Sequence, residues 1–445
     1  MSRSLNLLLP LLFIVFSIVA QATVPPSNTF TFVNDGGYGD YDDEYNSNYR
    51  LEPQGNFQNN GFALCFYNTT PSAYTLGLRM GSRPEDSTSN IMRWVWAANP
   101  GNPVGEKATL TLGTNGNLVL AHANGKVAWE TGTANRGVVR FEVLPTGNLV
   151  LVDSRGQYVW QSFMYPTDTL LVGQGLRTNG VTQLTSRVSN KDGSKGPYSL
   201  VLEKNRLALY FKSKNSPKPI LYYTNGNFNF DDSTISMVVL GTTKVEDEEI
   251  YRLSFNYFIN NDTNPFSITL ARPKYNSSLS FIRVESDGNI RMYTYNDKVI
   301  RGSWETTYIL FNREGTRSLS ECKWPARCGS LGVCQNNQCV GCPTPKGLTW
   351  FNNATCAAPK LPACKKGAVI QASYYKVVGV EHFTSDYTEG EGPVKLSECR
   401  AKCNADCGCR GFFYREESSK CLLAYELGTL SKVSMQSHVA YIKTA

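Results

Sequence analysis

Apolar and polar residues alternate along short stretches through much of this chain. The clearest stretch is residues 108–129, ATLTLGTNGNLVLAHANGKVAW, in which Asn115-Gly116 and Asn124-Gly125 interrupt the alternation. A period of two is typical of a strand with one buried face. Asn-Gly favours tight hairpin turns because both residues tolerate a positive φ. This stretch therefore predicts a meander of three strands.

The same pattern then returns further along the chain. NLVLAHANGKVAWE at residues 117–130 aligns without a gap with NLVLVDSRGQYVWQ at residues 148–161, so that Trp129 matches Trp160. Such a repeat indicates similar units that share one core. Weaker alternation at residues 198–211 and 280–296 extends the expected strands to about residue 311. We expect no long amphipathic helix before residue 390.

The N-terminus has a different pattern. Arg3 precedes an apolar run over residues 5–20, and Ala20-Gln21-Ala22 closes it with small residues. The run of about 16 residues is shorter than the roughly 20 that a spanning helix needs. We therefore predict a signal peptide over residues 1–22 and a secreted protein without a membrane span.

The residues after the predicted signal peptide are aromatic, glycine-rich and acidic. Phe30 and Phe32 alternate with threonine and predict one strand. The rest of residues 23–50 is expected to form a loop or an arm that lies on a neighbouring sheet.

The charge of the chain excludes one class of partner. The formal net charge is +7, but basic residues are scattered among acidic ones. Nucleic-acid binding needs a concentrated basic stripe, so we expect no nucleic-acid partner. A mildly basic secreted protein is compatible with acidic polysaccharide.

Cysteines are concentrated near the C-terminus. Twelve of the 13 lie between Cys322 and Cys421, and an exported chain meets an oxidising compartment. The cluster, including its CxxC and CxC spacings, is interpreted as a disulfide framework and not as a metal or redox site. Cys65 stands apart in GFALCFY; a buried thiol is favoured over an intermolecular disulfide. Ser397 is expected to cap a short helix.

Four N-x-[ST] triplets occur in the chain. In a secreted protein such triplets are candidate glycosylation sites on surface loops. They begin at Asn68, Asn261, Asn276 and Asn353.

Motifs for catalysis are absent from the sequence. The three histidines, His122, His382 and His438, form no HExxH pattern, and there is no G-x-S-x-G elbow, Walker A motif or kinase set. A catalytic pair of carboxylates, as in glycosidases, is not excluded by the sequence, because Asp and Glu are common and nothing singles out two of them. We predict a protein that is not an enzyme and needs no metal or cofactor.

Three segments carry a family resemblance. WVWAANPGNPV at residues 94–104, the NLVL repeats and WQSFMYPTDTLL at residues 160–171 resemble the plant bulb-type (snowdrop-like) mannose lectins and the S-locus glycoproteins. Met164 stands where that family usually has Asp. Residues 30–52 further resemble the secreted epidermis-specific glycoproteins, which lack a kinase. The resemblance covers about residues 55–310 and implies β-prisms of three small sheets.

Each repeat of a bulb-type lectin can carry a mannose pocket with the motif Q-x-D-x-N-x-V-x-Y. In this chain the motif falls on Gly113, Asn115, Asn117, Val119 and Ala121, then on Leu144, Thr146, Asn148, Val150 and Val152, and then on Val201, Glu203, Asn205, Leu207 and Leu209. The first two sets keep only Asn and Val, and in the third Glu203 resembles the motif's Asp but is longer. Lost polar partners cost about 1–3 kcal/mol each, whereas a millimolar site is worth only about 4 kcal/mol. We therefore predict inactive pockets, with the two retained asparagines as turn residues and the two valines as core residues.

The cysteine-rich segments resemble two further modules. Residues 319–357 resemble an EGF-like module, which implies the pairs Cys322–Cys334, Cys328–Cys339 and Cys342–Cys356. Residues 358–445 resemble a PAN/apple domain, which implies Cys399–Cys421 and Cys403–Cys409 and leaves Cys364 for Cys407.

The predicted fold is mainly β. Two β-prism, bulb-type lectin-like domains precede a small disulfide-rich EGF-like module and an α+β PAN/apple domain. The predicted boundaries are 1–22 for the signal peptide, 23–172 for the first lectin domain with its arm, 173–318 for the second, 319–357 for the EGF-like module and 358–445 for the PAN domain.

The favoured function is a secreted glycoprotein of the cell wall or apoplast. It would bind a cell-wall glycan or an extracellular protein, without catalysis, at surfaces other than intact mannose pockets. One alternative is an active lectin with a remodelled site. A second is a cell-wall hydrolase or hydrolase inhibitor. The sequence specifies neither the ligand nor the oligomeric state.

Overall fold

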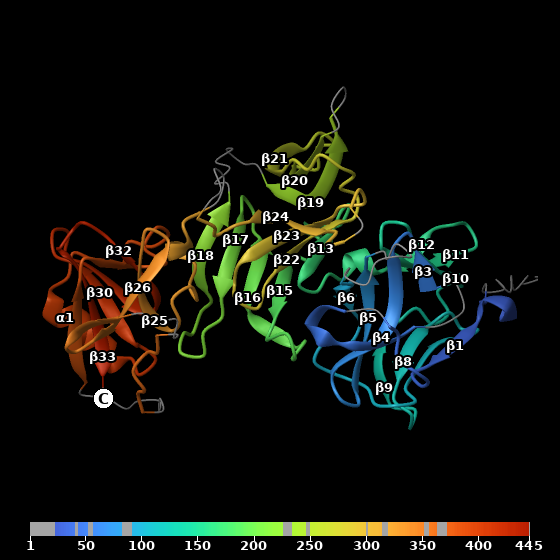
Figure 1. Cartoon of the computed structure of the whole chain (residues 1–445), viewed down its shortest axis with the longest axis horizontal. Coiled ribbons are helices and arrows are strands. Elements are labelled where there is room, and N and C mark those ends of the chain that lie inside the picture. The colour runs from blue at the N-terminus through green and yellow to red at the C-terminus, as the bar shows by residue number, and fades with distance from the viewer. Residues whose placement is uncertain are drawn as a thin grey trace, which may run out of the picture.

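Three lobes follow one another along the long axis of the molecule (Figure 1). The computed structural model describes residues 23–40, 43–51, 57–81, 91–225, 234–245, 250–299, 301–313, 319–350, 356–362 and 372–444. The first two lobes are β-prisms and the third combines sheets with one helix, which confirms the predicted mainly β fold. The predicted signal peptide lies outside the described residues.

The first prism consists of three antiparallel sheets around one core. Their strands, in spatial order, are β2 (Asn48–Leu51), β4 (Phe62–Thr70), β5 (Ala73–Met80) and β6 (Arg93–Ala97), with β3 (Gln58–Asn59) beside β4; β1 (Phe30–Val33), β7 (Thr109–Leu112), β8 (Leu118–Ala121) and β9 (Val127–Glu130); and β10 (Val138–Val143), β11 (Leu149–Asp153) and β12 (Tyr158–Gln161). Alternate residues of β7 and β8 are buried, as the period of two predicts. The β7–β8–β9 meander turns at Gly116 and Gly125, both with positive φ.

The sequence repeat corresponds to two equivalent hairpins, β8–β9 and β11–β12. Trp129 and Trp160 stand at equivalent positions on them, and Trp96 on β6 completes a triangle. The ring centroids are 5.8–6.2 Å apart and every pair is edge-to-face. One tryptophan from each sheet therefore closes one end of the prism.

The N-terminal arm is part of the prism. Strand β1 pairs with β7, and β2 pairs with β4, so the arm adds an edge strand to two sheets. Between them lies the short 3-10 helix Glu44–Asn46, in which Glu44 is buried. Another 3-10 turn, Pro26–Asn28, precedes β1.

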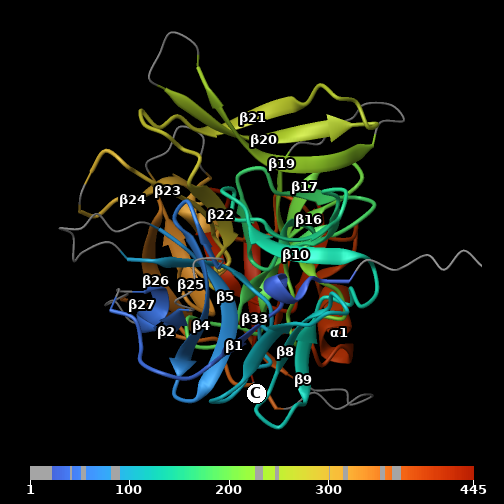
Figure 2. The same cartoon turned by 90° about the vertical axis from the view of Figure 1, so that its right-hand side faces the viewer.

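The second prism has three sheets of four strands each. They are β13 (Thr169–Leu171), β22 (Ser280–Val284), β23 (Ile290–Tyr295) and β24 (Trp304–Ile309); β14 (Gly175–Arg177), β19 (Ile235–Lys244), β20 (Tyr251–Ile259) and β21 (Phe266–Ala271); and β15 (Gln183–Arg187), β16 (Lys195–Leu202), β17 (Leu207–Phe211) and β18 (Ile220–Asn225). The β19–β21 sheet lies at the top of this prism in both views (Figure 1, Figure 2). Because β13 pairs with β22, the second prism begins before the predicted boundary at residue 172.

The third lobe joins the cysteine-rich segment and the PAN domain into one unit. One sheet has the order β27 (Gly347–Trp350), β26 (Gln338–Thr344), β25 (Leu331–Gln335), β32 (Gly428–Lys432) and β29 (Val380–His382); the other has β28 (Ser373–Val378), β33 (His438–Thr444), β30 (Gly411–Arg415) and β31 (Lys420–Ala424). Strand β25 of the cysteine-rich segment pairs in parallel with β32 of the PAN domain. The segments predicted as separate modules therefore share a sheet.

One α-helix, α1 (Leu396–Ala405), is present in the described part of the chain. Its N-cap is Lys395 and no side chain caps it, so the expectation that Ser397 caps this helix is wrong. Cys399 and Cys403 share its buried face, as their spacing predicts.

Five of the implied disulfides are present. They are Cys322–Cys334, Cys328–Cys339, Cys342–Cys356, Cys399–Cys421 and Cys403–Cys409. Cys407 is also disulfide-bonded, but Cys364 lies outside the described residues and its pairing stays a prediction. Cys65 is a buried free cysteine, and burial raises the pKa of its thiol to about 12.

No helix in the described ranges has the length and apolar character needed to cross a membrane.

Candidate functional site

The first position inherited from the lectin motif is held by internal hydrogen bonds. The Asn117 amide donates to Glu130 Oε2 at 2.7 Å, and its Oδ1 accepts from Thr131 Oγ1 at 3.1 Å and from the Thr133 N–H at 3.0 Å. Asn115 Oδ1 accepts from the Asn117 N–H at 3.0 Å, which closes the turn. Asn117 thus ties the start of β8 to the chain that follows β9.

The second position repeats this arrangement. The Asn148 amide donates to Gln161 Oε1 at 2.9 Å, and its Oδ1 accepts from Ser162 Oγ at 3.3 Å and from the Phe163 N–H at 3.1 Å. Val150 has 0% of its surface exposed, whereas Val119 is half-buried. The side-chain partners of the two asparagines occupy equivalent positions in the repeats, and each asparagine also accepts from a backbone N–H just beyond them. The repeat therefore preserves a contact that holds the fold.

The third position lies in the second prism, near the turn between β16 and β17. The Glu203 carboxylate accepts hydrogen bonds from Arg206 and from the Tyr210 hydroxyl. Leu207 is buried, and Asn205 is half-buried. This set belongs to a sheet of the second prism, whereas the first two sets lie on separate sheets of the first prism.

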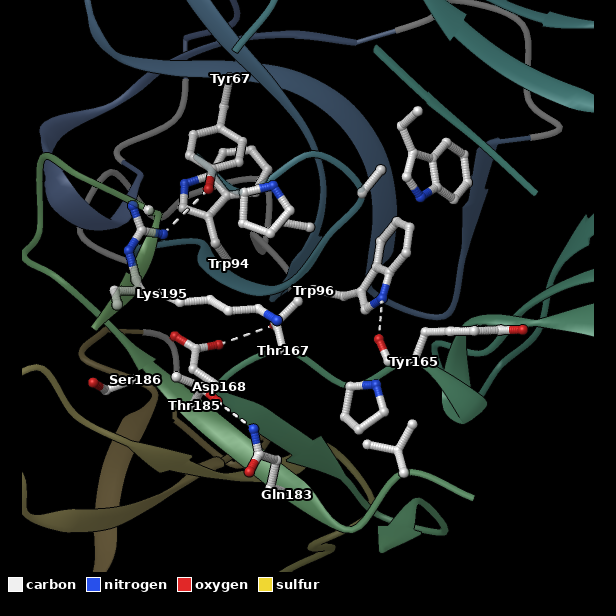
Figure 3. A pocket seen from close by; sticks show the side chains of 18 of the residues that line it. Tyr67, Trp94, Trp96, Tyr165, Thr167, Asp168, Gln183, Thr185, Ser186 and Lys195 are labelled. Atoms are coloured by element: carbon white, nitrogen blue, oxygen red, sulfur yellow. Dashed lines mark hydrogen bonds between the residues drawn. The ribbon is translucent and has the colours of Figure 1, made fainter. Parts of the chain in front are cut away.

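A cavity lies between the two prisms (Figure 3). We call it the interprism cleft; its volume is about 420 Å³. One wall is aromatic and comes from the first prism and the segment after it. It consists of Tyr67, Trp94, Trp96, Trp129, Trp160 and Tyr165.

The aromatic wall is held in place by its own contacts. Trp96 Nε1 donates to the Tyr165 carbonyl at 2.9 Å, and the Tyr165 ring stacks on Trp160 with centroids 5.8 Å apart. Tyr67 stacks on Trp94 at 4.0 Å. Tyr165 is 54% exposed, so its ring is the part of the wall most open to a ligand.

The opposite wall is polar and comes from the second prism. Alternate residues of β15, Gln183, Thr185 and Arg187, line it, and Lys195 at the start of β16 extends it. Successive side chains on a strand point to opposite faces, so these three share the face toward the cleft. Arg187 donates to the Tyr67 hydroxyl at 3.2 Å and links the two walls.

These walls suit a ligand with one apolar and one polar side. The volume is within the range of about 300–1,000 Å³ that small-molecule sites occupy. Sugars have C–H faces that pack on aromatic rings and hydroxyls that exchange hydrogen bonds with amide, hydroxyl and charged groups. The cleft can hold such a molecule between Tyr165 and β15.

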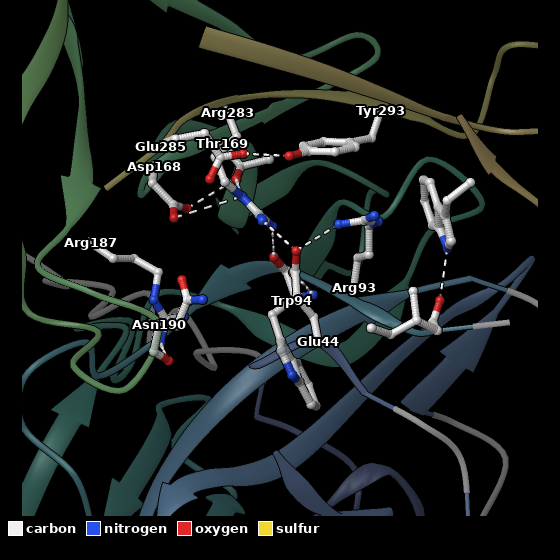
Figure 4. A network of polar contacts seen from close by, with 12 residues as sticks. Glu44, Arg93, Trp94, Asp168, Thr169, Arg187, Asn190, Arg283, Glu285 and Tyr293 are labelled. Carbon is white, nitrogen blue, oxygen red and sulfur yellow. Dashed lines mark hydrogen bonds and ion pairs between the residues drawn. The ribbon is translucent and has the colours of Figure 1, made fainter. Parts of the chain in front are cut away.

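A buried polar network behind the cleft fixes the two prisms together (Figure 4). Glu44 of the arm lies 2.8 Å from Arg93 of β6 and 2.8 Å from Arg283 of β22. Arg283 also donates to the Trp94 carbonyl and to Thr169 Oγ1, the latter at 3.3 Å. We call these groups the interprism clamp.

Charge sets the protonation of the clamp. Burial alone would raise the pKa of Glu44, but Arg283 and Arg93 outweigh it and lower the pKa below its usual 4.5. Burial raises the pKa of the nearby Glu285, whose carboxylate accepts a hydrogen bond from Tyr293 at 2.8 Å. Glu44 therefore stays ionised between its two arginines.

The glycosylation triplets fall in different surroundings. Asn261 and Asn276 are exposed. Asn68 is only 3% exposed on strand β4, so the expectation of a surface loop is wrong there. Asn353 lies outside the described residues. No cluster of three or more metal-ligating side chains occurs in the ranges described.

The cleft was not predicted from the sequence. Trp94, Trp96, Trp160 and Tyr165 lie in the segments that carry the family resemblance, but no local pattern pairs them with β15. The one available signal was the number of aromatic residues in those segments.

Comparison with known proteins agrees with this architecture. Residues 93–191 match the D-mannose binding lectin domain and residues 374–442 match the PAN domain. The chain is 44% identical to EP1-like glycoprotein 3 of Arabidopsis thaliana over 446 residues, covering 100% of this chain and 98% of that protein. It is 48% identical to the epidermis-specific secreted glycoprotein EP1 of Daucus carota over 375 residues, covering 81% and 94%.

More distant similarity extends to receptor kinases and a solved lectin. The G-type lectin S-receptor-like serine/threonine-protein kinase SD2-2 of Arabidopsis thaliana is 27% identical over 82% of this chain and 44% of its own length. A two-domain, fetuin-binding lectin from Scilla campanulata aligns with 60% of this chain and 96% of its own at 15% identity. Its TM-score is 0.18, too low to inform the fold.

Proposed function

The chain belongs to the EP1-like family of secreted glycoproteins, and we propose that it acts in the cell wall or apoplast as a non-catalytic carbohydrate-binding protein. The ligand site in this proposal is the interprism cleft. The predicted signal peptide and the secreted carrot relative support an extracellular location.

One observation carries the proposal: an aromatic wall with an exposed tyrosine and a strand of polar side chains line the same cavity of about 420 Å³. A concave, mostly apolar site with a few convergent polar groups is the usual form of a small-ligand site. Tyr165 supplies the stacking surface, and Gln183 and Thr185 supply hydrogen bonds.

The absence of catalysis is part of the same proposal. Among the described residues two carboxylates line the cleft, and both have partners. Glu130 accepts from Asn117, and Asp168 accepts from the Thr167 and Thr169 hydroxyls and lies 3.9 Å from Arg283. Because both carboxylates are held by protein partners, they support a binding role for the cleft and not the acid and base of a glycosidase.

We further propose that the inherited mannose positions bind no sugar. Both asparagines have their amide nitrogen and oxygen occupied by protein partners, and Val150 is not accessible. A sugar hydroxyl would have to displace contacts that hold the turns.

Tyr165→Ala tests the cleft. Its backbone carbonyl keeps the contact from Trp96, so the variant should fold. We expect calorimetric titration with a panel of neutral and acidic cell-wall oligosaccharides to give binding that weakens about tenfold or more, because a stacking contact and its buried area are lost.

The matched control is Tyr158→Ala, which removes a similarly exposed tyrosine (49%) from β12 outside the cleft. It should bind like the wild type. Equal binding by the wild type and Tyr165→Ala, or loss in both variants, would exclude the cleft as the site.

A further inference from the structure

We propose that the interprism cleft selects an acidic oligosaccharide and that the ammonium group of Lys195 receives a sugar carboxylate. This inference rests on the proposed function and names its ligand class. It starts from the charged groups that line the cleft or lie directly behind it.

Lys195 is the cation most available to a ligand. It is exposed, it lines the cleft, and its ammonium group forms no ion pair or hydrogen bond among the described residues. Figure 3 shows its side chain extending from β16 toward Thr167, along the polar wall. Arg187 is already engaged by Tyr67 and by the ring of Tyr45, whose centroid is 4.3 Å away.

The acidic groups that line the cleft are engaged by partners other than Lys195. Asp168 is buried, faces Arg283 at 3.9 Å and accepts from Thr167 and Thr169. Glu130 belongs to the opposite, aromatic wall, where Asn117 donates to it.

The acids behind the cleft already have cationic partners. Three guanidinium groups, those of Arg93, Arg187 and Arg283, meet Glu44 and Asp168. A third acid, Glu285, has its pKa raised by burial and also interacts with Arg283. Each of these acids therefore faces an arginine, which leaves Lys195 available to a ligand.

A uronic acid matches this distribution. Its pyranose ring offers a C–H face to Tyr165, and its carboxylate projects from the ring edge toward Lys195. A charge-assisted hydrogen bond from an ammonium group to a carboxylate is stronger than a neutral one. A neutral sugar would use the aromatic wall and leave Lys195 without a partner.

The experiment compares a trimer of galacturonic acid with its methyl ester, which has nearly the same shape and no charge. We expect calorimetry on the full secreted chain to give tighter binding of the acid, and the difference to shrink at high ionic strength. Lys195→Met should weaken binding of the acid about tenfold and leave the ester unchanged.

Lys191→Met is the control, because it removes an exposed lysine outside the cleft, from the loop that precedes β16. It should bind both trimers like the wild type. If Tyr165→Ala weakens binding of a neutral oligosaccharide while Lys195→Met changes nothing, the cleft is a sugar site and the acidic selectivity is wrong. If neither variant affects any ligand, the proposed function fails as well.

Discussion

At the residue scale, the asparagines of the repeat perform a structural task in a lectin scaffold. Asn117 and Asn148 each donate to a side chain at the end of the next strand and accept from the backbone beyond it. The lectin motif uses the same residue type for sugar hydroxyls. The two uses compete, because an amide has only two donor hydrogens and one oxygen.

Asn117→Ala should therefore reduce stability and not sugar binding. The buried Thr133 N–H would lose its acceptor, and the free energy of unfolding should fall by about 2–3 kcal/mol. Chemical denaturation measures this value, and Asn124→Ala, in the exposed turn of the same meander, should cost under about 1 kcal/mol. Mannose binding that is lost in Asn117→Ala without any loss of stability would contradict the structural role.

A second residue-scale prediction concerns His382, at the end of β29. Its Nε2 lies 2.8 Å from the Glu426 carbonyl, so the neutral ring carries its proton there, and Nδ1 accepts from Thr384. Burial lowers the pKa of His382 from 6.5 to about 4, although the Glu426 carbonyl partly opposes this.

Below pH 6.5 the unfolded chain takes up a proton at His382 that the folded chain does not. The stability contributed by neutral His382 is therefore complete above pH 6.5 and declines as pH falls toward 4, by about 3 kcal/mol in total. His382→Gln should flatten this part of a denaturation profile, whereas His122→Gln on the β8–β9 hairpin should not. An unchanged slope in His382→Gln would show that other groups cause the loss.

At the scale of elements, the parallel pairing of β25 with β32 makes the third lobe one cooperative unit. Val333 and Leu430 face each other across that pairing, and both are fully buried. A small cysteine-rich segment has little core of its own. It gains one by adding its strands to the PAN sheet.

Leu430→Ala should loosen both parts together. The cavity should cost about 2–5 kcal/mol, and hydrogen exchange should accelerate in β25 and β26 as well as in β29 and β32. Leu348→Ala, at a half-exposed position on β27, is the control and should change little. Loss of protection in the PAN strands alone would mean that the two modules fold independently.

At the scale of the whole molecule, the interprism clamp holds together the two prisms whose walls form the cleft. The arm, β6 and β22 each contribute a charged group to it, and they are far apart in the sequence. Removing one partner of a buried ion pair leaves the other charge buried and unpaired. This lowers the free energy of unfolding by about 3–5 kcal/mol.

Glu44→Gln should lower the free energy of unfolding by about that amount at neutral pH. Because the folded pKa of Glu44 is below 4.5, its contribution is present above pH 4.5 and is lost as pH falls through the folded value. The variant should therefore lose less stability than the wild type on acidification, as measured by thermal denaturation. Glu142→Gln, which breaks the half-exposed pair with Arg140, should behave like the wild type. An equal loss of stability in both variants would show that the clamp contributes no more than a surface ion pair.

Local pattern was enough to predict much of the fold. Alternation and Asn-Gly turns predicted the meander, and the repeat predicted equivalent hairpins, because both depend on neighbours within a few residues. Cysteine spacing with the module resemblance implied five pairs that the structure contains. The pairing of β13 with β22 and of β25 with β32 was not predicted, because strand pairing across modules leaves no local signal.

Sequence pattern alone predicted the strands, the turns, the prism repeat and the poor match of the mannose motif. Tertiary structure was needed to show that the retained asparagines have protein partners, that Asn68 is buried and that Tyr165 and Lys195 line the same cleft. The reason is physical: a strand's period reports which face is buried, but not which distant strand covers it. The site combines side chains from two prisms, so it exists only when the clamp brings them together.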